Sequence, residues 1–422
     1  MYQRKFIFYK HTQENVISVS KDNLFSDTLG FGFLTERNRE EDELLQVPEV
    51  NNGFKLPDKE KIDVKTNICQ DELGCFLQEA DIPLSFKASI PHNGNYRVSL
   101  KVRTGAQGVD HLLVLAQCRR LMAYGKKLEA NQTYEYNFNV NVCSIIPDHN
   151  KVPHNNTGVT ISLLGGNVRI TELSIEEVDL PTIFIAGDST VTDQLGNYPY
   201  LPSENYCGWG QMLTVYANDK IALSNHAHSG LTTETFISEG HYQIVMDHIK
   251  PGDFYFMQFG HNDQKVATLD AKGGYANNIK KFINEIREKG ATPVIVTSIA
   301  RNTWEKNEEK ILDMLSDNAK EGVQRDDKSK YRDLLHEYAQ ECINIGHEEK
   351  VPVIDLHGRS MEFIKSLGME PAKVYFYPND YTHTNDFGGF KMATYVWDEC
   401  KKVDILANLF KDEGQEFPIE MA

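Results

Sequence analysis

The stretch PTIFIAGDSTVTDQ at residues 181–194 decides the fold of the second half of the chain. Its β-prone apolar run, Thr182 to Ala186, stops abruptly at Gly187, and an acid and two hydroxyl side chains follow. A continuous apolar run bounded by a turn signal is typical of a strand buried on both faces, as in a parallel sheet. Two interpretations are open here. Either Asp188 and Ser189 are ordinary residues at the start of a helix, or Ser189 is presented for chemistry.

Further apolar runs follow at intervals along the chain: KIALSNHA (220–227), DFYFMQFG (253–260), PVIVTSIA (293–300) and VPVIDL (351–356). Helical patterns lie between them. The clearest is residues 275–290, which places four apolar residues on one face and Gly290 at the C′ position. Strands that alternate with helices predict an α/β fold with a five-stranded, doubly wound parallel sheet. We expect this α/β domain to span residues 181–422.

The first part of the chain, residues 1–178, has a different pattern. Apolar and polar residues alternate in NYRVSLKVRTG (95–105), QTYEYNFNVNV (132–142) and GVTISLLGGNVRITELSIEEV (158–178). Turn residues separate these segments. This alternation is typical of half-buried antiparallel strands and predicts a β-sandwich domain before the boundary at 178–181.

Composition limits the classes of partner. The chain has 422 residues, of which 40% are hydrophobic and 25% charged, and its formal net charge is −17. Such an acidic chain disfavours nucleic acid and anionic membranes as partners, and an acidic polysaccharide would be repelled unless a local basic patch compensates. The start, MYQRKFIFYKHTQEN, lacks the apolar core of a signal peptide, which predicts a cytoplasmic protein unless a native signal has been removed.

Neither a cofactor nor a metal is expected. The sequence contains no GxGxxG and no GxxxxGK[ST] motif. Its seven cysteines are scattered, without CxxC spacing, so they indicate free thiols. His226 and His228 have the spacing of two strand ligands, but no nearby Cys or acid completes a set, which favours a polar packing role.

The chemistry is expected at the carboxyl ends of the strands, where the strand order reverses. In a flavodoxin-like order, strand one lies between strands two and three, so the segments Gly187–Ser189, His228–Gly230 and Gly260–Asp263 converge around Ser189. A serine needs a base to become a nucleophile, and the late segment NDYTHTNDFGG (379–389) contains Asp380 and His383, three residues apart. The carboxylate would orient the imidazole, whose other nitrogen would face Ser189.

An oxyanion needs hydrogen-bond donors. The backbone N–H groups of Ser189 and Gly230 and the side-chain amide of Asn262 are suited to this task, and a helix starting at Ser189 would add its positive end. Each motif alone is weak, because GDS and GHND also occur as turns and caps. Together, the four segments supply the parts of one mechanism.

These residues resemble the SGNH (GDSL-like) hydrolases, and most closely the rhamnogalacturonan acetylesterase branch of the carbohydrate esterases. The matching blocks are IFIAGDSTV (183–191), GWGQML (208–213), SGLTTETF (229–236), QFGHND (258–263) and DYTHTNDFGG (380–389). The resemblance implies Ser189 as nucleophile, His383 as base, Asp380 as orienting acid, and an oxyanion hole made of Ser189, Gly230 and Asn262. It also implies deacetylation of plant cell-wall sugars, so that an acetylated oligo- or polysaccharide is the partner.

Several departures and alternatives stay open. Leu231 and Glu234 stand where the branch usually has arginines, which weakens the pectin assignment because arginine pairs well with carboxylates.

The alternatives are a lipase or thioesterase of the same fold, an acetyl xylan esterase, and a non-catalytic carbohydrate-binding protein. The N-terminal part resembles a galactose-binding-like domain, which either binds sugar or packs against the esterase. Trp209 either lines a pocket or packs. The charged segment 303–330 is either a flap or, as we expect, an exposed, partly mobile insertion. The sequence leaves the oligomeric state open.

Overall fold

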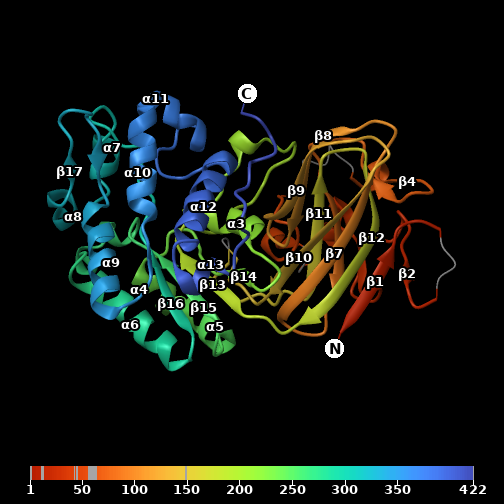
Figure 1. Cartoon of the computed structure of the whole chain (residues 1–422), viewed down its shortest axis with the longest axis horizontal. Coiled ribbons are helices and arrows are strands. Elements are labelled where there is room, and N and C mark those ends of the chain that lie inside the picture. The colour runs from red at the N-terminus through yellow and green to blue at the C-terminus, as the bar shows by residue number, and fades with distance from the viewer. Residues whose placement is uncertain are drawn as a thin grey trace.

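The computed structural model has a β-rich N-terminal half and an α/β C-terminal half, which lie side by side (Figure 1). The N-terminus is at the edge of the β-rich half, and the C-terminal segment runs back toward the junction between the halves (Figure 1). The structure describes residues 2–10, 14–41, 43, 46–55, 64–147 and 150–421.

Two sheets form the N-terminal half. The larger has the order β10-β7-β12-β1-β2, with β4 and β5 beside β12, and the smaller has the order β3-β6-β11-β8-β9. All strand pairs in these sheets are antiparallel except β1 with β2. The strands of the larger sheet are β1 (Gln3–Ile7), β2 (Ile17–Ser18), β4 (Cys69–Gln70), β5 (Cys75–Phe76), β7 (Gly94–Thr104), β10 (Thr133–Val142) and β12 (Val168–Val178). Those of the smaller sheet are β3 (Phe31–Phe33), β6 (Leu84–Ser89), β8 (Val109–Ala116), β9 (Arg120–Leu128) and β11 (Gly158–Leu164).

A parallel sheet of order β14-β13-β15-β16-β19 forms the centre of the C-terminal half. Its strands are β13 (Thr182–Gly187), β14 (Ala222–Asn225), β15 (Phe254–Gln258), β16 (Thr292–Val296) and β19 (Val353–Ile354). The first strand lies between the second and third, so the predicted doubly wound fold and its strand order are confirmed.

Helices cover both faces of this sheet (Figure 1). Along β13, Phe184 and Ala186 pack toward α4 (Thr233–Ser238), α5 (His241–His248), α6 (Gly274–Glu288) and α9 (His336–Glu349). Ile183 and Ile185 point to the other face, which α3 (Trp209–Leu213), α10 (Leu356–Leu367) and α12 (Asp386–Cys400) cover. The remaining helices are short: α1 (Glu36–Glu41), α2 (Val64–Asn67), α7 (Glu309–Leu312), α8 (Asp317–Glu321), α11 (Met369–Ala372) and α13 (Asp404–Ala407).

Helix α6 has the boundaries and the buried face that its pattern predicts. Its four predicted apolar residues, Ile279, Phe282, Ile283 and Ile286, are all buried. The helix ends at Glu288, and Gly290 follows the C-cap with a φ of +75°, the left-handed conformation expected of a C′ glycine.

The two halves share apolar packing. Strand β8 is buried on both sides, because Leu112 and Val114 face the interior of the sandwich whereas Leu113 and Leu115 belong to the cluster around α3 and α12. The junction therefore resembles a domain core more than a loose contact. The assignment of residues 1–178 as a galactose-binding-like accessory domain stays a prediction.

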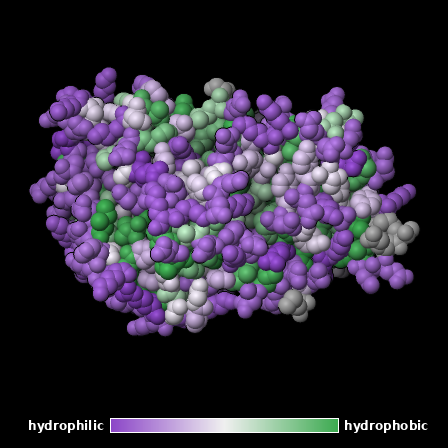
Figure 2. All heavy atoms as spheres, in the orientation of Figure 1, coloured by the Kyte–Doolittle hydropathy of each residue, from purple (hydrophilic) through white to green (hydrophobic). Residues whose placement is uncertain are grey.

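The face of the molecule seen in Figure 2 is mainly hydrophilic. Polar and charged residues cover most of the face seen in Figure 2, with smaller apolar areas between them. Within the described ranges, every helix is too short or too polar to cross a membrane.

Candidate active site

Ser189 lies in a tight turn directly after β13. The N–H groups of Val191 and Thr192 both donate to the Asp188 carbonyl, at 3.0 and 3.1 Å. The predicted helix from Ser189 is wrong, because the carbonyls that would continue it accept hydrogen bonds from another segment. Trp209 N–H donates to Thr190 O at 3.2 Å, and Gly210 N–H donates to Val191 O at 3.1 Å. Ser189 therefore does not stand at the N-terminus of a helix.

The GWG sequence brings the start of α3 against this turn. A Cβ atom on Gly208 would lie 2.3 Å from the Val191 carbonyl carbon, and one on Gly210 would lie 2.6 Å from the Val191 oxygen. Only glycine permits this close approach. Trp209 between them is fully buried, and its indole N–H donates to Gln258 Oε1 at 2.8 Å, so it packs at the helix start and lines no pocket.

Asp380 and His383 lie in one turn before α12, as their spacing predicts. The carboxylate Oδ1 accepts hydrogen bonds from the N–H groups of Thr382, at 2.7 Å, and His383, at 3.0 Å. Its Oδ2 lies 2.8 Å from His383 Nδ1, and His383 Nε2 lies 2.8 Å from Ser189 Oγ. The chain of hydrogen bonds from serine to histidine to aspartate is therefore continuous.

The surroundings keep Asp380 ionised. Burial opposes ionisation of Asp380, but hydrogen bonds from the His383 ring and from two backbone N–H groups lower the pKa of its carboxyl to about 2. An ionised carboxylate at Nδ1 favours the tautomer of His383 that carries its proton there. In that tautomer Nε2 is free to accept the Ser189 proton.

The loops that carry the predicted oxyanion donors are joined to each other. Asn262 Nδ2 donates to Leu231 O at 3.0 Å, which places the amide beside Gly230. Gly230 has a φ of +80°, and a Cβ atom there would meet open space, so its backbone is accessible at the turn. The donor roles of Gly230, Asn262 and the Ser189 N–H stay predictions.

Two buried acids connect the strand ends beneath the site. Asp263 accepts from Thr233 N–H and Oγ1, at 2.9 and 2.7 Å, and from Gly260 N–H at 3.1 Å. Burial raises the pKa of Asp263 to about 6. Although burial opposes its ionisation, His261 and Thr190 hold the pKa of Asp188 below its usual value, whereas burial lowers the pKa of His261 to about 4. These contacts connect the loops after β13, β14 and β15.

A pocket of about 330 Å³ opens at the serine. Its lining includes Ser189, Asn262, Asp380 and His383, so four of the five predicted site residues meet in one place. The other lining residues are His261, Lys265, Arg301, Lys310, Ile311, Met314, Asn379, Tyr381 and Thr382.

The segment 303–330 contributes part of this lining through Lys310, Ile311 and Met314. It carries α7 and α8, and β17 (Gln324–Arg325) pairs with β18 (Arg332–Asp333). A small apolar cluster, Ile311, Leu315, Ala319, Val323 and Leu334, holds it together. The segment is therefore a folded part of the pocket wall, in which Ile311 is buried while Lys310 and Met314 are exposed as expected. Its partial mobility stays a prediction.

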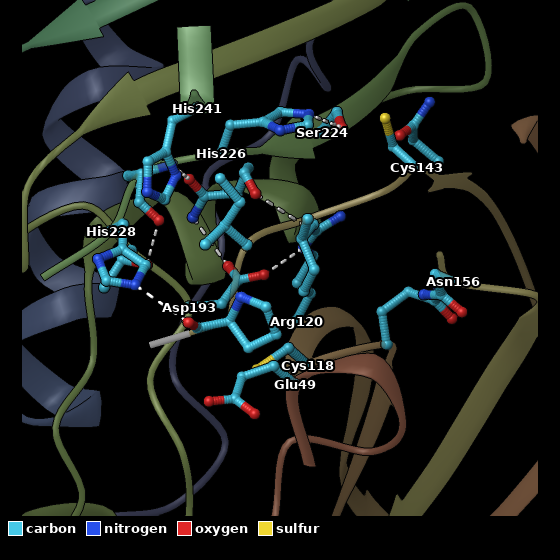
Figure 3. Close-up of a pocket in the computed structure, with 18 residues that line it drawn as sticks. Glu49, Cys118, Arg120, Cys143, Asn156, Asp193, Ser224, His226, His228 and His241 are labelled. Carbon is cyan, nitrogen blue, oxygen red and sulfur yellow. Dashed lines mark hydrogen bonds and ion pairs between the residues drawn. The ribbon is translucent and has the colours of Figure 1, made fainter. Parts of the chain in front are cut away.

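Another pocket, of about 40 Å³, lies at the junction of the two halves (Figure 3). There Arg120 Nε and Asp193 Oδ2 form an ion pair at 2.6 Å, and His226 Nε2 lies 2.8 Å from Ser224 Oγ. His228 Nε2 lies 3.3 Å from the Pro147 carbonyl, so the two histidines of the predicted spacing have separate protein partners. Across the part of the chain that the structure describes, no group of three or more His, Cys, Asp or Glu could hold a metal ion.

Sequence reasoning missed the cations of the active-site pocket. Arg301 follows the predicted strand 293–300 directly, so the rule that sites lie at strand ends could have found it. Lys265 follows the GHND block by two residues, which is a weaker signal. Lys310 lies in a segment with no recognisable motif, and only the fold brings it to the serine.

The chain belongs to the GDSL-like lipase/acylhydrolase family, whose pattern matches residues 185–388. This membership confirms the family predicted from the motifs and makes the chain a hydrolase of carboxylic esters. Over 250 residues the chain is 30% identical to the rhamnogalacturonan acetylesterase RhgT of Bacillus subtilis, covering 56% of this chain and 96% of that protein. The rhamnogalacturonan acetylesterase of Emericella nidulans is 25% identical over 253 residues, covering 54% of this chain and 88% of that protein. A crystal structure of protein YxiM from Bacillus subtilis aligns over 95% of this chain and 98% of that one, with 21% identity and a TM-score of 0.44.

Proposed function

We propose that this chain is a serine esterase that removes O-acetyl groups from carbohydrate, with oligosaccharides derived from pectin or rhamnogalacturonan as substrates. The observation that carries this proposal is the chain of two 2.8 Å contacts from Ser189 to His383 to Asp380. The names of the relatives RhgT and the Emericella nidulans enzyme support the acetyl group and the sugar.

In the proposed reaction, Ser189 Oγ attacks the carbonyl carbon of the acetyl ester while His383 Nε2 takes its proton. Asp380 stabilises the resulting imidazolium and keeps the ring in place. Collapse of the tetrahedral intermediate breaks the bond to the sugar oxygen, which receives the proton from His383. A water molecule, deprotonated by the same nitrogen, then hydrolyses the acetyl-enzyme and frees Ser189.

The negatively charged oxygen of each tetrahedral intermediate needs hydrogen-bond donors within reach. The proposed donors are the N–H groups of Ser189 and Gly230 and the side-chain amide of Asn262. Asn262 is held on both sides, because Nδ2 donates to Leu231 O and Oδ1 accepts from Lys265 Nζ at 2.8 Å. A donor that is already oriented needs little reorganisation when charge develops.

The lining of the pocket favours a small acyl group on a polar alcohol. Apart from Ile311, Met314 and Tyr381, the lining side chains are polar or charged. A long acyl chain needs a continuous apolar groove, since each buried methylene contributes only about 0.8 kcal/mol. The lipase and thioesterase alternatives therefore have less support than an acetylesterase.

The test is acetate release from acetylated pectin, acetylated xylan and acetylated xylo-oligosaccharides, beside aryl esters of increasing acyl length. We expect acetate release from the pectin fragments and a preference for acetyl over longer aryl esters. Ser189→Ala should lower kcat by at least about 10⁴-fold. Ser203→Ala, at an exposed serine outside the pocket, is the matched control.

Three results would contradict the proposal, the first two in its chemistry and the third in its sugar. A preference for long acyl chains would place the chain among the lipases or thioesterases of the fold. Equal turnover by wild type and the Ser189→Ala variant would remove the serine from the mechanism. Release from xylan but not from pectin would keep the chemistry and replace the sugar.

A further inference from the structure

Three positively charged side chains line the pocket of Ser189. They are Lys265, at the end of a 3₁₀ turn (Asp263–Lys265), Arg301, just beyond β16, and Lys310, on α7. Among the described residues, the only carboxylate in the lining is that of Asp380, which faces His383. Leaving histidines aside, the formal charge of the lining is therefore +3 from the cations and −1 from Asp380, or +2, in a chain with a net charge of −17.

None of these three cations has an ion-pair partner among the described residues. Two other buried arginines are neutralised by ion pairs, Arg119 with Asp386 and Arg332 with Glu308. Lys265, by contrast, donates to the neutral Asn262 oxygen, and Lys310 has no hydrogen-bond or ion-pair partner in the described part of the chain. Their positive charge is therefore available to a ligand.

Arg301 is the strongest of the three observations, because its side chain is only 4% exposed and yet borders the pocket. Its guanidinium donates to two neutral acceptors, the Thr382 hydroxyl and the His261 carbonyl, and its Nε–H has no partner among the described atoms. Burial lowers the pKa of Arg301 to about 10, so the group still carries its charge at neutral pH. The nearby Asp188 and Asp380 carboxylates offset part of the cost of burying this cation, although neither forms an ion pair with it among the described residues. An anionic ligand would offset more of that cost.

The chemistry of acetyl transfer does not require these charges. The ester is neutral, and the oxyanion is already provided for by Ser189, Gly230 and Asn262. A cationic wall beside a neutral reacting group instead suggests recognition of a second, negatively charged group on the same substrate.

We propose that Lys265, Arg301 and Lys310 form a subsite for the carboxylate of an acidic sugar that carries or adjoins the acetyl ester. Lys265 and Lys310 contact the carboxylate, and Arg301 contributes its charge from beneath. The inference rests on the proposed function and deepens it, because it makes a uronic acid residue a determinant of substrate choice.

This subsite uses a different part of the fold from the second motif block, where Leu231 and Glu234 stand. One of its members, Lys310, comes from the segment 303–330, whose Ile311 and Met314 form the adjoining apolar wall. The segment therefore acquires a role in specificity. The overall negative charge of the molecule is also compatible with an acidic substrate, because the positive charges of the pocket lining act on the substrate locally.

The test compares two forms of one acetylated oligogalacturonide, with free carboxylates and with methyl-esterified carboxyls. The readout is the ratio of their kcat/KM values. We expect wild type to favour the free acid by at least about fivefold at low salt, and the preference to shrink as NaCl is added. Lys310→Glu should lower the ratio by about tenfold, mainly through KM for the free acid.

The matched control is Lys306→Glu. It changes the net charge by the same amount in the same segment, at an exposed residue outside the pocket, and should keep the wild-type ratio. The subsite is refuted if wild type cleaves the neutral form equally well, or if both lysine variants alter the ratio alike. If the wild-type protein releases acetate from neither form, the proposed function is refuted instead. Failure of the subsite and failure of the proposed function are therefore distinguishable.

Discussion

At the scale of single residues, Asn262 is the part of the proposed oxyanion site that a variant can test most directly. Its amide has fixed partners, Leu231 O and Lys265 Nζ, and it borders the same pocket as Ser189. We expect Asn262→Ala to lower kcat for an aryl acetate by about 100- to 1000-fold with little change in KM, because the donor acts mainly in the transition state. Steady-state kinetics measures both.

Asn277→Ala is the control for this prediction, since Asn277 is exposed on α6 and is not among the lining residues of the pocket. A thermal unfolding curve for each variant excludes a loss of fold as the cause. If Asn262→Ala turns over the ester at the wild-type rate, Asn262 has no oxyanion role.

The residues that could be predicted from sequence each have a local signal. Ser189 follows a continuous apolar run, and Asp380 and His383 are close enough in sequence to share a turn. Lys310 has no such signal, because its approach to Ser189 depends on how the apolar residues of its own segment pack. Contacts between distant segments are set by tertiary packing, and a single sequence carries no local trace of them.

At the scale of elements, the start of α12 depends on a residue from the other half of the chain. Asp386, three residues after His383, is fully buried and pairs with Arg119 at 2.7 Å. Arg119 also donates to the Tyr206 carbonyl at 2.8 Å, and the Tyr206 ring lies edge-on to His383 with centroids 5.7 Å apart. Arg119 is therefore a positioning residue for the histidine loop.

Arg119→Met should lower the free energy of unfolding by about 3–5 kcal/mol, because it leaves the Asp386 carboxylate buried without its counter-ion. It should also lower kcat more than it raises KM at temperatures where the variant is folded. Urea unfolding and steady-state kinetics measure these effects. Adding Asp386→Asn should restore part of the stability, since the unpaired charge is then removed.

Lys126→Met is the matched control, because Lys126 also joins the two halves, in an ion pair with Glu416 at 3.3 Å, but on the surface. Loss of this surface ion pair should lower the free energy of unfolding by less than about 1 kcal/mol. Equal destabilisation by the two substitutions would show that Arg119 acts only as one more junction contact.

The sequence predicts the bounds of some strands and helices better than those of others. Strand β13 matches its apolar run, because burial on both faces makes every residue apolar and Gly187 marks the end. Strand β19 is only two residues long, although the run VPVIDL is longer, since an edge strand has one neighbour to pair with. The helix predicted at Ser189 is absent because α3 takes the carbonyls it needs, and this competition is invisible in the local sequence.

At the scale of the whole molecule, the junction pocket makes stability depend on pH (Figure 3). Burial lowers the pKa of His226 from 6.5 to about 3 and that of His241 to about 3, so both are neutral in the folded state at pH 5. The unfolded chain binds these protons below about pH 6.5. A folded pKa below the unfolded value means that stability is complete above pH 6.5 and is lost as the pH falls toward 3.

For His226 alone, this linkage amounts to about 2 kcal/mol between pH 7 and pH 5. His261 acts in the same direction, whereas Asp263, whose pKa burial raises to about 6, acts in the opposite one. The total slope therefore mixes several groups, and a difference between variants isolates one. We expect His226→Gln to reduce the loss of unfolding free energy over this range by about 2 kcal/mol relative to wild type, in urea titrations at both pH values.

His347→Gln, at an exposed histidine on α9, should keep the wild-type dependence. Parallel curves for wild type and His226→Gln would mean that His226 takes up its proton without unfolding, and that the junction opens to water as the pH falls.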